Sequence, residues 1–284
     1  MQLLYDRRDL DDAERRGDSR LLWLRDLGAN AIQDLPSDGE GFLFGYQLPC
    51  NEFAALVDSY PGVHDRPADR GQLIHLEDIL SKLELANISV PTPRTWILRI
   101  DDPLPLDLTF PLFVRTSMSS WKRGGHSSKV RNPQELEDEC ELFRRSFRWD
   151  ATILAREWIN LSVAGEWRYG SVPVEIRVWI VDAHALAWSF HYLHFVPNPQ
   201  GFPPSVADLD QIAEYAQHIA APFSSRLIAA DFVRDTAGKW HFLEAGPGAC
   251  SGTSHEYVFK SVASKLIGRD VYFVPDKVGG LFPR

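Results

Sequence analysis

In the first 90 residues, apolar positions recur every three or four residues, and short strand-like runs separate these helical segments. One strand-like run is GFLFGYQLP at 41–49. This alternation of helical and strand-like segments predicts a small α/β unit over residues 1–90. The helical spacing is clearest in the set Leu73, Leu76, Ile79, Leu80 and Leu83.

Prolines at positions 91 and 93 mark a change of texture, after which strands are expected. They punctuate the chain ahead of the first predicted strand. Together with the helix described next, these strands would make a second unit over residues 91–160. The predicted strands are TWILRI at 95–100, PLFVRTS at 111–117 and ATILAREWI at 151–159.

A helix is predicted to begin at Asn132 and Pro133. Asn is a good N-cap, Pro suits the first helical position, and Glu135 stands where a capping box needs an acceptor. The helix should pack one face on the neighbouring strands. That face carries Leu136, Cys140 and Phe143.

Two β-hairpins are predicted in a third unit, residues 161–284. In VEIRVWIV (174–181), Val and Ile alternate with Glu175, Arg177 and Trp179, so one face is core and the other carries charge. The partner of this strand is ALAWSFHYLHF. The second hairpin pairs LIAADFVRD with KWHFLEAG.

The second hairpin carries two acids, Asp231 and Glu244. If its connection has an even number of residues, Asp231 lies opposite Phe242 and Glu244 shares its face, whereas a slip of one residue separates the acids. Two acids on strands are often a solvated sheet face, but here apolar residues flank each, and an unpaired buried carboxylate is costly. We therefore expect a magnesium site, since Mg²⁺ prefers one or two carboxylates with phosphate oxygens.

The stretch from Arg115 to Lys129 has the composition of a phosphate-binding loop. Backbone N–H groups of Gly- and Ser-rich loops approach phosphates closely, and nearby cations complete the charge. A solvated hairpin loop explains the composition equally well, because the segment is not a Walker A motif. The residues expected to act here with Arg115 are Lys122, Gly124, Gly125, His126 and Ser127.

Charge and composition exclude some classes of function. Acidic residues (39) outnumber Lys and Arg (30), giving a net charge of −9, which argues against a general nucleic-acid binder. There is no apolar leader at the start and no apolar run near 18 residues, so we expect a cytoplasmic protein without a membrane partner. The three cysteines are widely spaced and indicate neither a disulfide framework nor a zinc site.

Over roughly residues 88–260, the order of these parts resembles the ATP-grasp superfamily, the fold of many ATP-dependent carboxylate-amine ligases. ISVPTPRTWIL resembles the entry into the nucleotide-binding lobe, and FPLFVRTSMSSWKRGGHSSKV the basic strand with its mobile phosphate loop. ILAREWI resembles the hinge strand, VEIRVWIVDAHALAWS the strand pair with a phosphate-contacting arginine, and LIAADFVRDTAGKWHFLEAGPGACSG the acidic magnesium hairpin.

The resemblance implies an ATP-grasp fold of two α/β lobes, with residues 1–90 as the preceding α/β domain, residues 91–160 as the small lobe and residues 161–284 as the large lobe. Arg115 takes the place of a phosphate-binding lysine, and the loop from Lys122 to Ser127 covers the phosphates. By the same resemblance, Arg177 would steady the transferred phosphoryl group or the acyl-phosphate intermediate. Adenine binding is implied for Glu157, Trp158 and Ile159, and metal binding for Asp231 and Glu244.

Two positions depart from the family pattern. Gly246 stands where an asparagine ligand is usual, and Arg115 replaces the usual lysine, which keeps the charge but changes its geometry. An active subfamily with altered ligands and an inactive ATP-binding relative both account for these departures. We favour the active subfamily because Arg177, Asp231 and Glu244 are all present.

The implied activity is an ATP- and Mg²⁺-dependent ligase that joins a carboxylate to an amine through an acyl-phosphate, with Arg177 and Lys122 as catalytic cations. The substrate would be a small molecule or peptide. A phosphotransferase on the same fold and a nucleotide-binding module without turnover are the alternatives. The sequence leaves the oligomeric state open.

Three other side chains and one turn remain to be placed. Trp121 could close over nucleotide or anchor the loop at the surface, and His191 and His194, three apart in a predicted strand, would lie on opposite faces. Ser251 and Gly252 follow the acidic hairpin, where they could present N–H groups to a substrate or cap the next helix.

Overall fold

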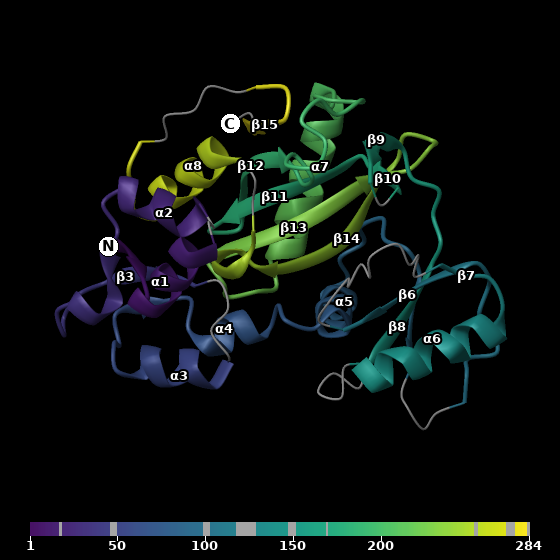
Figure 1. Cartoon of the computed structure of the whole chain (residues 1–284), viewed down its shortest axis with the longest axis horizontal. Helices are drawn as coiled ribbons and strands as arrows, with labels where there is room; N and C mark the ends of the chain where they lie inside the picture. Colours follow the sequence, from purple (N-terminus) through teal and green to yellow (C-terminus); the bar gives the residue numbers. More distant parts are fainter. Residues whose placement is uncertain are drawn as a thin grey trace.

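The computed structural model describes residues 1–16, 19–45, 50–98, 103–117, 129–146, 152–168, 170–252, 255–270 and 276–282. Within these ranges the chain forms four sheets. A central sheet lies between an N-terminal unit and a lobe that carries helix α6 (Figure 1). No helix in the described ranges is long and apolar enough to cross a membrane.

The N-terminal unit is a parallel sheet with helices between and after its strands. Its strand order is β2 (Asn30–Ala31), β1 (Gln2–Tyr5), β3 (Gly41–Phe44) and β4 (Val63–His64). The strands are short; β3 is buried throughout and β1 at its two central residues, as expected for the middle of a covered parallel sheet. The other elements are α1 (Arg7–Arg16), α2 (Ser19–Asp26), η1 (Ile32–Asp34), α3 (Cys50–Asp58), α4 (Pro67–Gly71) and α5 (Leu76–Leu85).

The lobe that follows is a four-stranded antiparallel sheet covered by one helix. Its order is β5 (Thr95–Leu98), β8 (Ile153–Glu157), β6 (Leu112–Thr116) and β7 (Lys129–Val130). The helix, α6 (Pro133–Ser146), begins at the predicted cap, where Asn132 Oδ1 accepts from the Glu135 N–H at 2.9 Å. Its predicted apolar face is buried in the core of this lobe.

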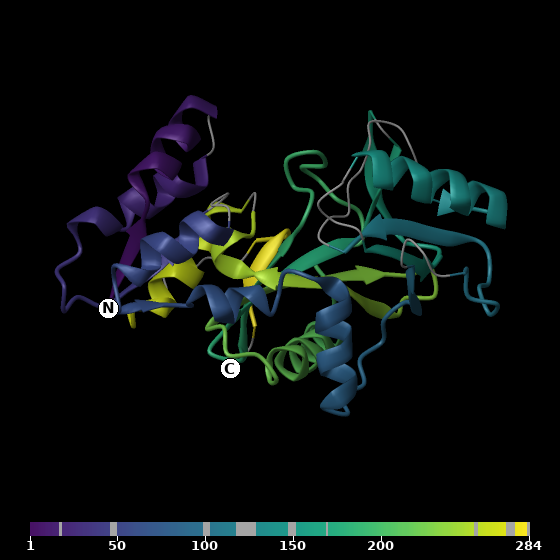
Figure 2. The ribbon, with the colours of Figure 1, turned by 90° about the horizontal axis from the view of Figure 1, so that it is seen from below.

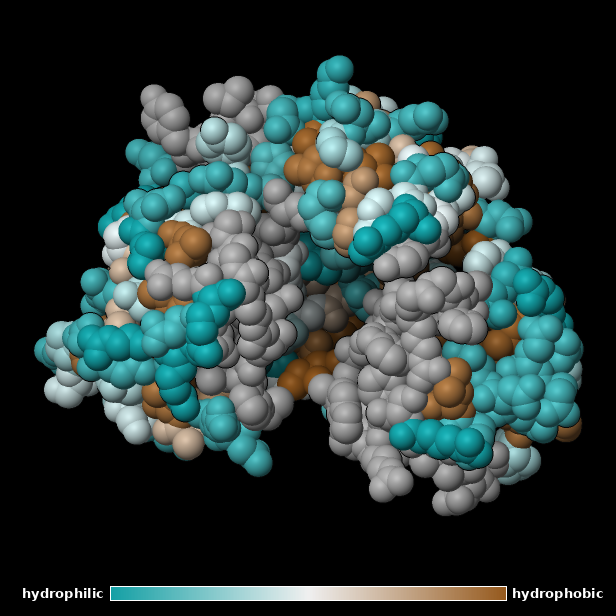
Figure 3. All heavy atoms as spheres, viewed as in Figure 1, coloured by the Kyte–Doolittle hydropathy of each residue, from teal (hydrophilic) through white to brown (hydrophobic). Residues whose placement is uncertain are grey.

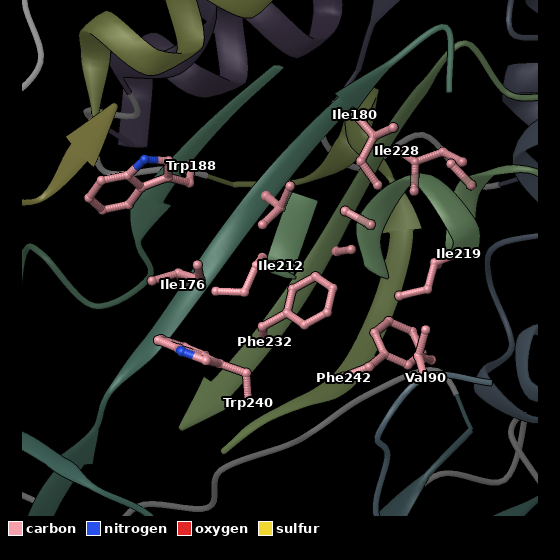
Figure 4. Close-up of a cluster of buried hydrophobic side chains, with 14 of the residues drawn as sticks. Val90, Ile176, Ile180, Trp188, Ile212, Ile219, Ile228, Phe232, Trp240 and Phe242 are labelled. Carbon is pink, nitrogen blue, oxygen red and sulfur yellow. The ribbon is translucent and has the colours of Figure 1, made fainter. Parts of the chain in front are cut away.

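The central sheet is antiparallel, with the order β14 (Trp240–Pro247), β13 (Leu227–Arg234), β11 (Glu175–Val181), β12 (His184–Phe190) and β15 (Gly279–Leu281). Helix α7 (Val206–Ala220) and α5 cover one face (Figure 2). Ile212 and Ile219 of α7 pack there on Phe232 of the sheet (Figure 4). Helix α8 (Glu256–Leu266) covers the other. The hairpin of β9 (Val163–Trp167) and β10 (Gly170–Pro173) and the short helix η2 (Gly248–Cys250) complete the order.

The alternation predicted in β11 is confirmed. Ile176, Val178 and Ile180 lie in the core beneath α7, whereas Glu175, Arg177 and Trp179 share the opposite face. That face changes character along the strand, because Trp179 packs against Phe259 of α8 with ring centroids 6.4 Å apart. The expectation of a charged face therefore holds only for the first half of β11.

The partner strand β12 is shorter than the sequence pattern predicts. It ends at Phe190, and residues 191–195 form turns in which the N–H groups of Phe195 and Val196 donate to the Tyr192 carbonyl. The prediction that His191 and His194 lie on opposite faces of a strand is therefore wrong. The apolar pattern of the sequence continues past Phe190, but the neighbouring strand β11 begins at Glu175 and its ladder with β12 ends at the pair Ile176 and Phe190.

The β13–β14 hairpin brings Asp231 and Glu244 together, but with a pairing register that differs from the predicted one. Its connection, residues 235–239, is odd in length, because β13 ends at Arg234 and β14 begins at Trp240. Asp235 Oδ1 stabilises this turn by accepting from the N–H groups of Ala237 (2.9 Å) and Lys239 (2.8 Å). The ladder from this turn pairs Phe232 with Phe242, so a regular continuation would place Asp231 opposite Leu243.

A β-bulge at Leu243 corrects this register. The extra residue on β14 lets the next pair be Asp231 with Glu244. The expectation that Asp231 faces Phe242 is wrong, but the two acids do lie together. Phe242 instead pairs with Phe232, and both rings lie in the core with their centroids 5.9 Å apart. The boundaries at residues 90 and 160 stay a prediction.

A matched pair of leucines tests the core of the α6 lobe. Leu136 is fully buried and Leu85 is 84% exposed, and both are helical. We expect Leu136→Ala to lower the free energy of unfolding by about 2–5 kcal/mol because it leaves a cavity, and Leu85→Ala to change it by less than about 0.5 kcal/mol. Urea unfolding of both variants measures the difference, and equal midpoints would contradict the packing described.

Candidate active site

A cavity of about 440 Å³ lies where the three parts of the chain meet. The α6 lobe contributes Arg115 and Ser117, the central sheet contributes Arg177, Asp231 and Glu244, and α3 to α5 contribute much of the remaining wall. The molecular surface is hollowed between the N-terminal unit and the α6 lobe (Figure 3). The volume of the cavity suits a small molecule.

Arg177 and Asp231 form a buried, two-pronged ion pair on neighbouring strands. They are direct partners in the β11–β13 ladder, and Arg177 donates from Nε and Nη2 to the two carboxylate oxygens at 2.8 and 2.7 Å. Nη1 donates to the carbonyl oxygen of Gly252. Burial lowers the pKa of Arg177, but the Asp231 charge more than offsets this, so its pKa is raised.

Glu244 receives its cation from the other lobe. Arg115 at the end of β6 donates from Nη1 to Glu244 Oε2 and from Nε to the Thr116 carbonyl oxygen at 3.0 Å. Burial raises the pKa of Glu244, but the charge and hydrogen bond of Arg115 prevail, so its pKa lies below the ordinary value. The arginine side chain is 5% exposed and the glutamate side chain 29%.

Arg156 is a third buried arginine, which the sequence reasoning missed. From β8 it donates to the carbonyl oxygen of the bulged residue Leu243 at 2.7 Å and to the hydroxyls of Thr92 and Thr95. Burial and the charge of Arg115 lower its pKa to about 9, so it remains a cation at neutral pH. An arginine inside the buried run ILARE was the available signal.

Glu175 and His191 extend the polar cluster next to Asp231. One ligand atom from each of these three residues lies within 4.8 Å of the others, a set that could hold a metal ion. Glu175 Oε2 also accepts from the Tyr192 hydroxyl at 3.1 Å; burial, followed by this carboxylate, raises the pKa of Tyr192 well above its ordinary value. The alternation along β11 predicted that Glu175 lies on the same face as Arg177. The position of His191 was not predictable, because β12 ends at Phe190, one residue before it.

The oxygen donors of Asp231 and Glu244 fit a hard cation such as Mg²⁺. Both residues line the cavity and stand side by side on paired strands. Gly246 also lines it, and a Cβ added there would meet its nearest heavy atom, Ser251 Oγ, only at 3.8 Å. A Cβ therefore fits without a clash at the position where the family pattern has asparagine.

The residues expected to bind adenine do not belong to the described wall of this cavity. Glu157 ends β8 and its N–H donates to the Arg94 carbonyl, while the Trp158 N–H donates to the Pro111 carbonyl. The Trp158 ring lies under Lys129, with Nζ 4.2 Å from its centroid. Neither they nor Ile159 are among the residues that line the cavity in the described ranges.

The two residues expected to bind substrate have different positions. Ser251 lines the cavity, and its hydroxyl donates to the Pro247 carbonyl at 3.0 Å. Gly252 contributes a carbonyl oxygen to Arg177. Neither caps α8, because His255 Nδ1 accepts from the Val258 N–H there at 3.3 Å. Outside the described residues lie Trp121 and the expected phosphate-loop residues Lys122, Gly124, Gly125, His126 and Ser127.

A family model described as an ATP-grasp domain matches residues 100–266, more than half of the chain. The chain belongs to the ATP-grasp family. The resemblance drawn from the sequence is therefore confirmed, and the match includes all four charged residues of the two ion pairs. No curated protein matches the chain.

Solved structures share the ATP-grasp fold of this chain. D-alanine–D-alanine ligase from Bacillus anthracis, complexed with ATP, is 15% identical with a TM-score of 0.61, covering 94% of this chain and 96% of its own. A RimK domain ATP-grasp protein from Sphaerobacter thermophilus is 14% identical with a TM-score of 0.58, covering 94% and 99%. The predicted fold class, ATP-grasp preceded by an α/β unit, is confirmed.

Replacing Arg115 by Met should destabilise this ATP-grasp protein in a pH-dependent way. The lowered pKa of Glu244 means that its ion pair contributes stability above the ordinary value of 4.5, and that this contribution is lost as pH falls through the folded-state pKa. We expect a loss of about 1–3 kcal/mol at neutral pH, because the half-buried Glu244 carboxylate loses its cation. The loss should shrink under pH 4.5.

Urea unfolding at several pH values measures this effect. The matched control is Arg145→Met, which removes an exposed pair with Glu141. We expect the control to change stability by less than about 0.5 kcal/mol at every pH. An Arg115→Met loss that does not vary with pH would mean that the pair contributes packing rather than charge.

Proposed function

We propose that this ATP-grasp protein is an ATP-dependent ligase that joins a carboxylate to an amine. The carboxylate oxygen attacks the γ-phosphorus of ATP and ADP leaves, giving an acyl-phosphate. The amine nitrogen then attacks the acyl carbon, phosphate leaves, and the nitrogen loses a proton. The supporting observation is the pair of arginine–carboxylate contacts, Arg177–Asp231 and Arg115–Glu244, in one cavity of an ATP-grasp chain.

The two arginines would orient and neutralise the transferring phosphoryl group. Little covalent work is needed in phosphoryl transfer, so fixed cations in a site that excludes water supply most of the catalysis. Asp231 holds the guanidinium of Arg177 in one plane, which leaves it preorganised. Asp231 and Glu244 would hold Mg²⁺, which when bound would offset charge on the phosphates.

We retain the other roles implied by the family resemblance as part of this proposal. The loop with Lys122 as a catalytic cation would cover the phosphates and exclude water that would hydrolyse the acyl-phosphate. The residues Glu157, Trp158 and Ile159 would bind adenine. Ser251 and Gly252 would contact the substrate. The acid and the amine would be small molecules or peptides.

The proposal predicts release of ADP and phosphate that requires both an acid and an amine. Pooled amino acids and short peptides, assayed with ATP and Mg²⁺, provide the screen, with Asp231→Asn and Glu244→Gln as variants. We expect Glu244→Gln to lower the rate by about 100-fold, about 2.7 kcal/mol of transition-state stabilisation. Glu141→Gln, at an exposed site on α6, should leave the rate unchanged.

Other products would select another function. AMP and pyrophosphate would refute the acyl-phosphate route. ADP with a stable phosphorylated product and no amine requirement would indicate a phosphotransferase. ATP binding without turnover would indicate a nucleotide-binding module, the candidate that Gly246 favours because it removes a metal-ligand side chain from the cavity wall.

Gly246→Asn tests whether the metal site lacks a ligand. A Cβ at position 246 meets no close neighbour, and the amide oxygen of an asparagine there could bind the ion. We expect the Mg²⁺ concentration for half-maximal ADP release to fall about tenfold, equivalent to about 1.4 kcal/mol. Gly246→Ala, which adds bulk without an oxygen, should not produce this decrease. An unchanged requirement in the Asn variant would place the ion elsewhere.

A further inference from the structure

Arg70 is a buried cation in the wall of the cavity, and the proposed phosphoryl transfer assigns it no role. It lies in α4, is 5% exposed, and lines the same cavity as Arg177 and Glu244. Its guanidinium carbon lies 4.2 Å from the ring centroid of Phe53. The N-terminal unit therefore contributes a positive charge to the cavity.

The hydrogen-bonding capacity of Arg70 is only partly used by the described residues. Nη2 donates to the Leu43 carbonyl oxygen, and Nη1 contacts the weakly accepting Cys250 Sγ at 3.6 Å. Nε is buried and has no hydrogen-bond partner among these residues. A guanidinium has five N–H groups, and a buried donor without a partner costs about 1–3 kcal/mol.

No carboxylate in the described part of the chain forms an ion pair with Arg70. Asp65 interacts electrostatically with Arg70, but its carboxylate oxygens accept from the Ser225 hydroxyl at 2.8 Å and the Arg226 N–H at 2.6 Å. Asp231 and Glu244 already bind arginines of their own. Among the described residues Arg70 thus has an electrostatic neighbour but no ion-pair partner, and an anion bound in the cavity would complete its charge.

The surroundings of Arg70 indicate which kind of anion would bind. Apolar side chains make up most of the cavity wall near α4 and α5, and hydrophobic atoms are visible at the base of the hollow in Figure 3. A carboxylate on an apolar body complements one fork-shaped cation beside such a wall. The apolar residues concerned are Phe53, Leu73, Ile74, Leu76, Ala245 and Pro247.

We propose that Arg70 binds the carboxylate of an apolar amino acid or short peptide substrate, whose side chain rests on the α4–α5 wall. This inference rests on the proposed ligase function and specifies its substrate class. The helix that carries Arg70 is fixed in place by Asp69. Asp69 Oδ2 accepts from the Arg66 N–H at 3.0 Å and caps the N-terminus of α4, and Asp69 Oδ1 accepts from the Ser224 hydroxyl.

The test compares an acid with its uncharged amide. N-acetyl-leucine and N-acetyl-leucinamide are titrated calorimetrically into the full chain saturated with ADP and Mg²⁺. We expect the wild type to bind the acid at least tenfold more tightly than the amide. Arg70→Met, which keeps length but removes charge, should abolish this preference, and Arg70→Lys should retain part of it, because one charge remains without the fork.

The affinity for ADP shows whether each variant is folded, and it should be unchanged; should Arg70→Met fail to fold, Arg70→Lys decides. A purely structural Arg70 would alter stability without changing the ratio of acid to amide affinity. Equal affinities in the wild type, absence of binding, or a preference that survives Arg70→Met would overturn the inference.

The ADP-release assay separates this inference from the proposed function. Turnover without an acid preference would refute only the role of Arg70. An Arg70-dependent acid preference without turnover would leave a carboxylate-binding site on a protein that is not a ligase.

Discussion

The buried pairing of Arg177 with Asp231 is the interaction on which the site depends. Two charges removed from water are stable only when their geometry is good, and here the two-pronged contact joins direct neighbours in a β-ladder. It fixes the register of β11 against β13 and determines which face carries the site. The bulge at Leu243 then brings Glu244 to that face, so the acidic pair is a consequence of sheet geometry.

The α6 lobe is connected to the central sheet through charges of the same site. Arg115 contacts Glu244, and Arg156 contacts the carbonyl of the preceding residue, Leu243. A nucleotide whose phosphates compete with Glu244 for Arg115 would therefore act on the contact between the two lobes as well as on its own binding. Under the proposed function, this would couple binding of the phosphates to the relative position of the lobes.

The N-terminal unit belongs to the same packed structure. Phe44 of its sheet and Trp179 of the central sheet both contact Phe259 of α8, with ring centroids 5.4 and 6.4 Å apart. A shared apolar core holds these parts together, and α4 is positioned so that Arg70 enters the cavity wall. The proposed substrate subsite thus depends on the burial of these aromatic rings, since Phe44 follows Leu43, whose carbonyl accepts from Arg70.

The sequence by itself determined the features that depend on near neighbours along the chain. The cap at Asn132, the alternating faces of β11 and the short strands of the α6 lobe follow from local spacing and capping chemistry, and they are present in the structure. The nearness of the two acids was also predicted, although through the wrong register. The order of the elements was enough to indicate the family.

Only the tertiary structure decided which charges meet. Arg115 and Glu244 are 129 residues apart, and Arg70 and Cys250 are 180 apart, so no periodicity in the chain could pair them. The bulge at Leu243 and the end of β12 at Phe190 likewise depend on long-range contacts. A pattern of residues indicates the face on which a side chain lies, whereas the partner of a buried charge is selected by the packing of distant segments that exclude water from it.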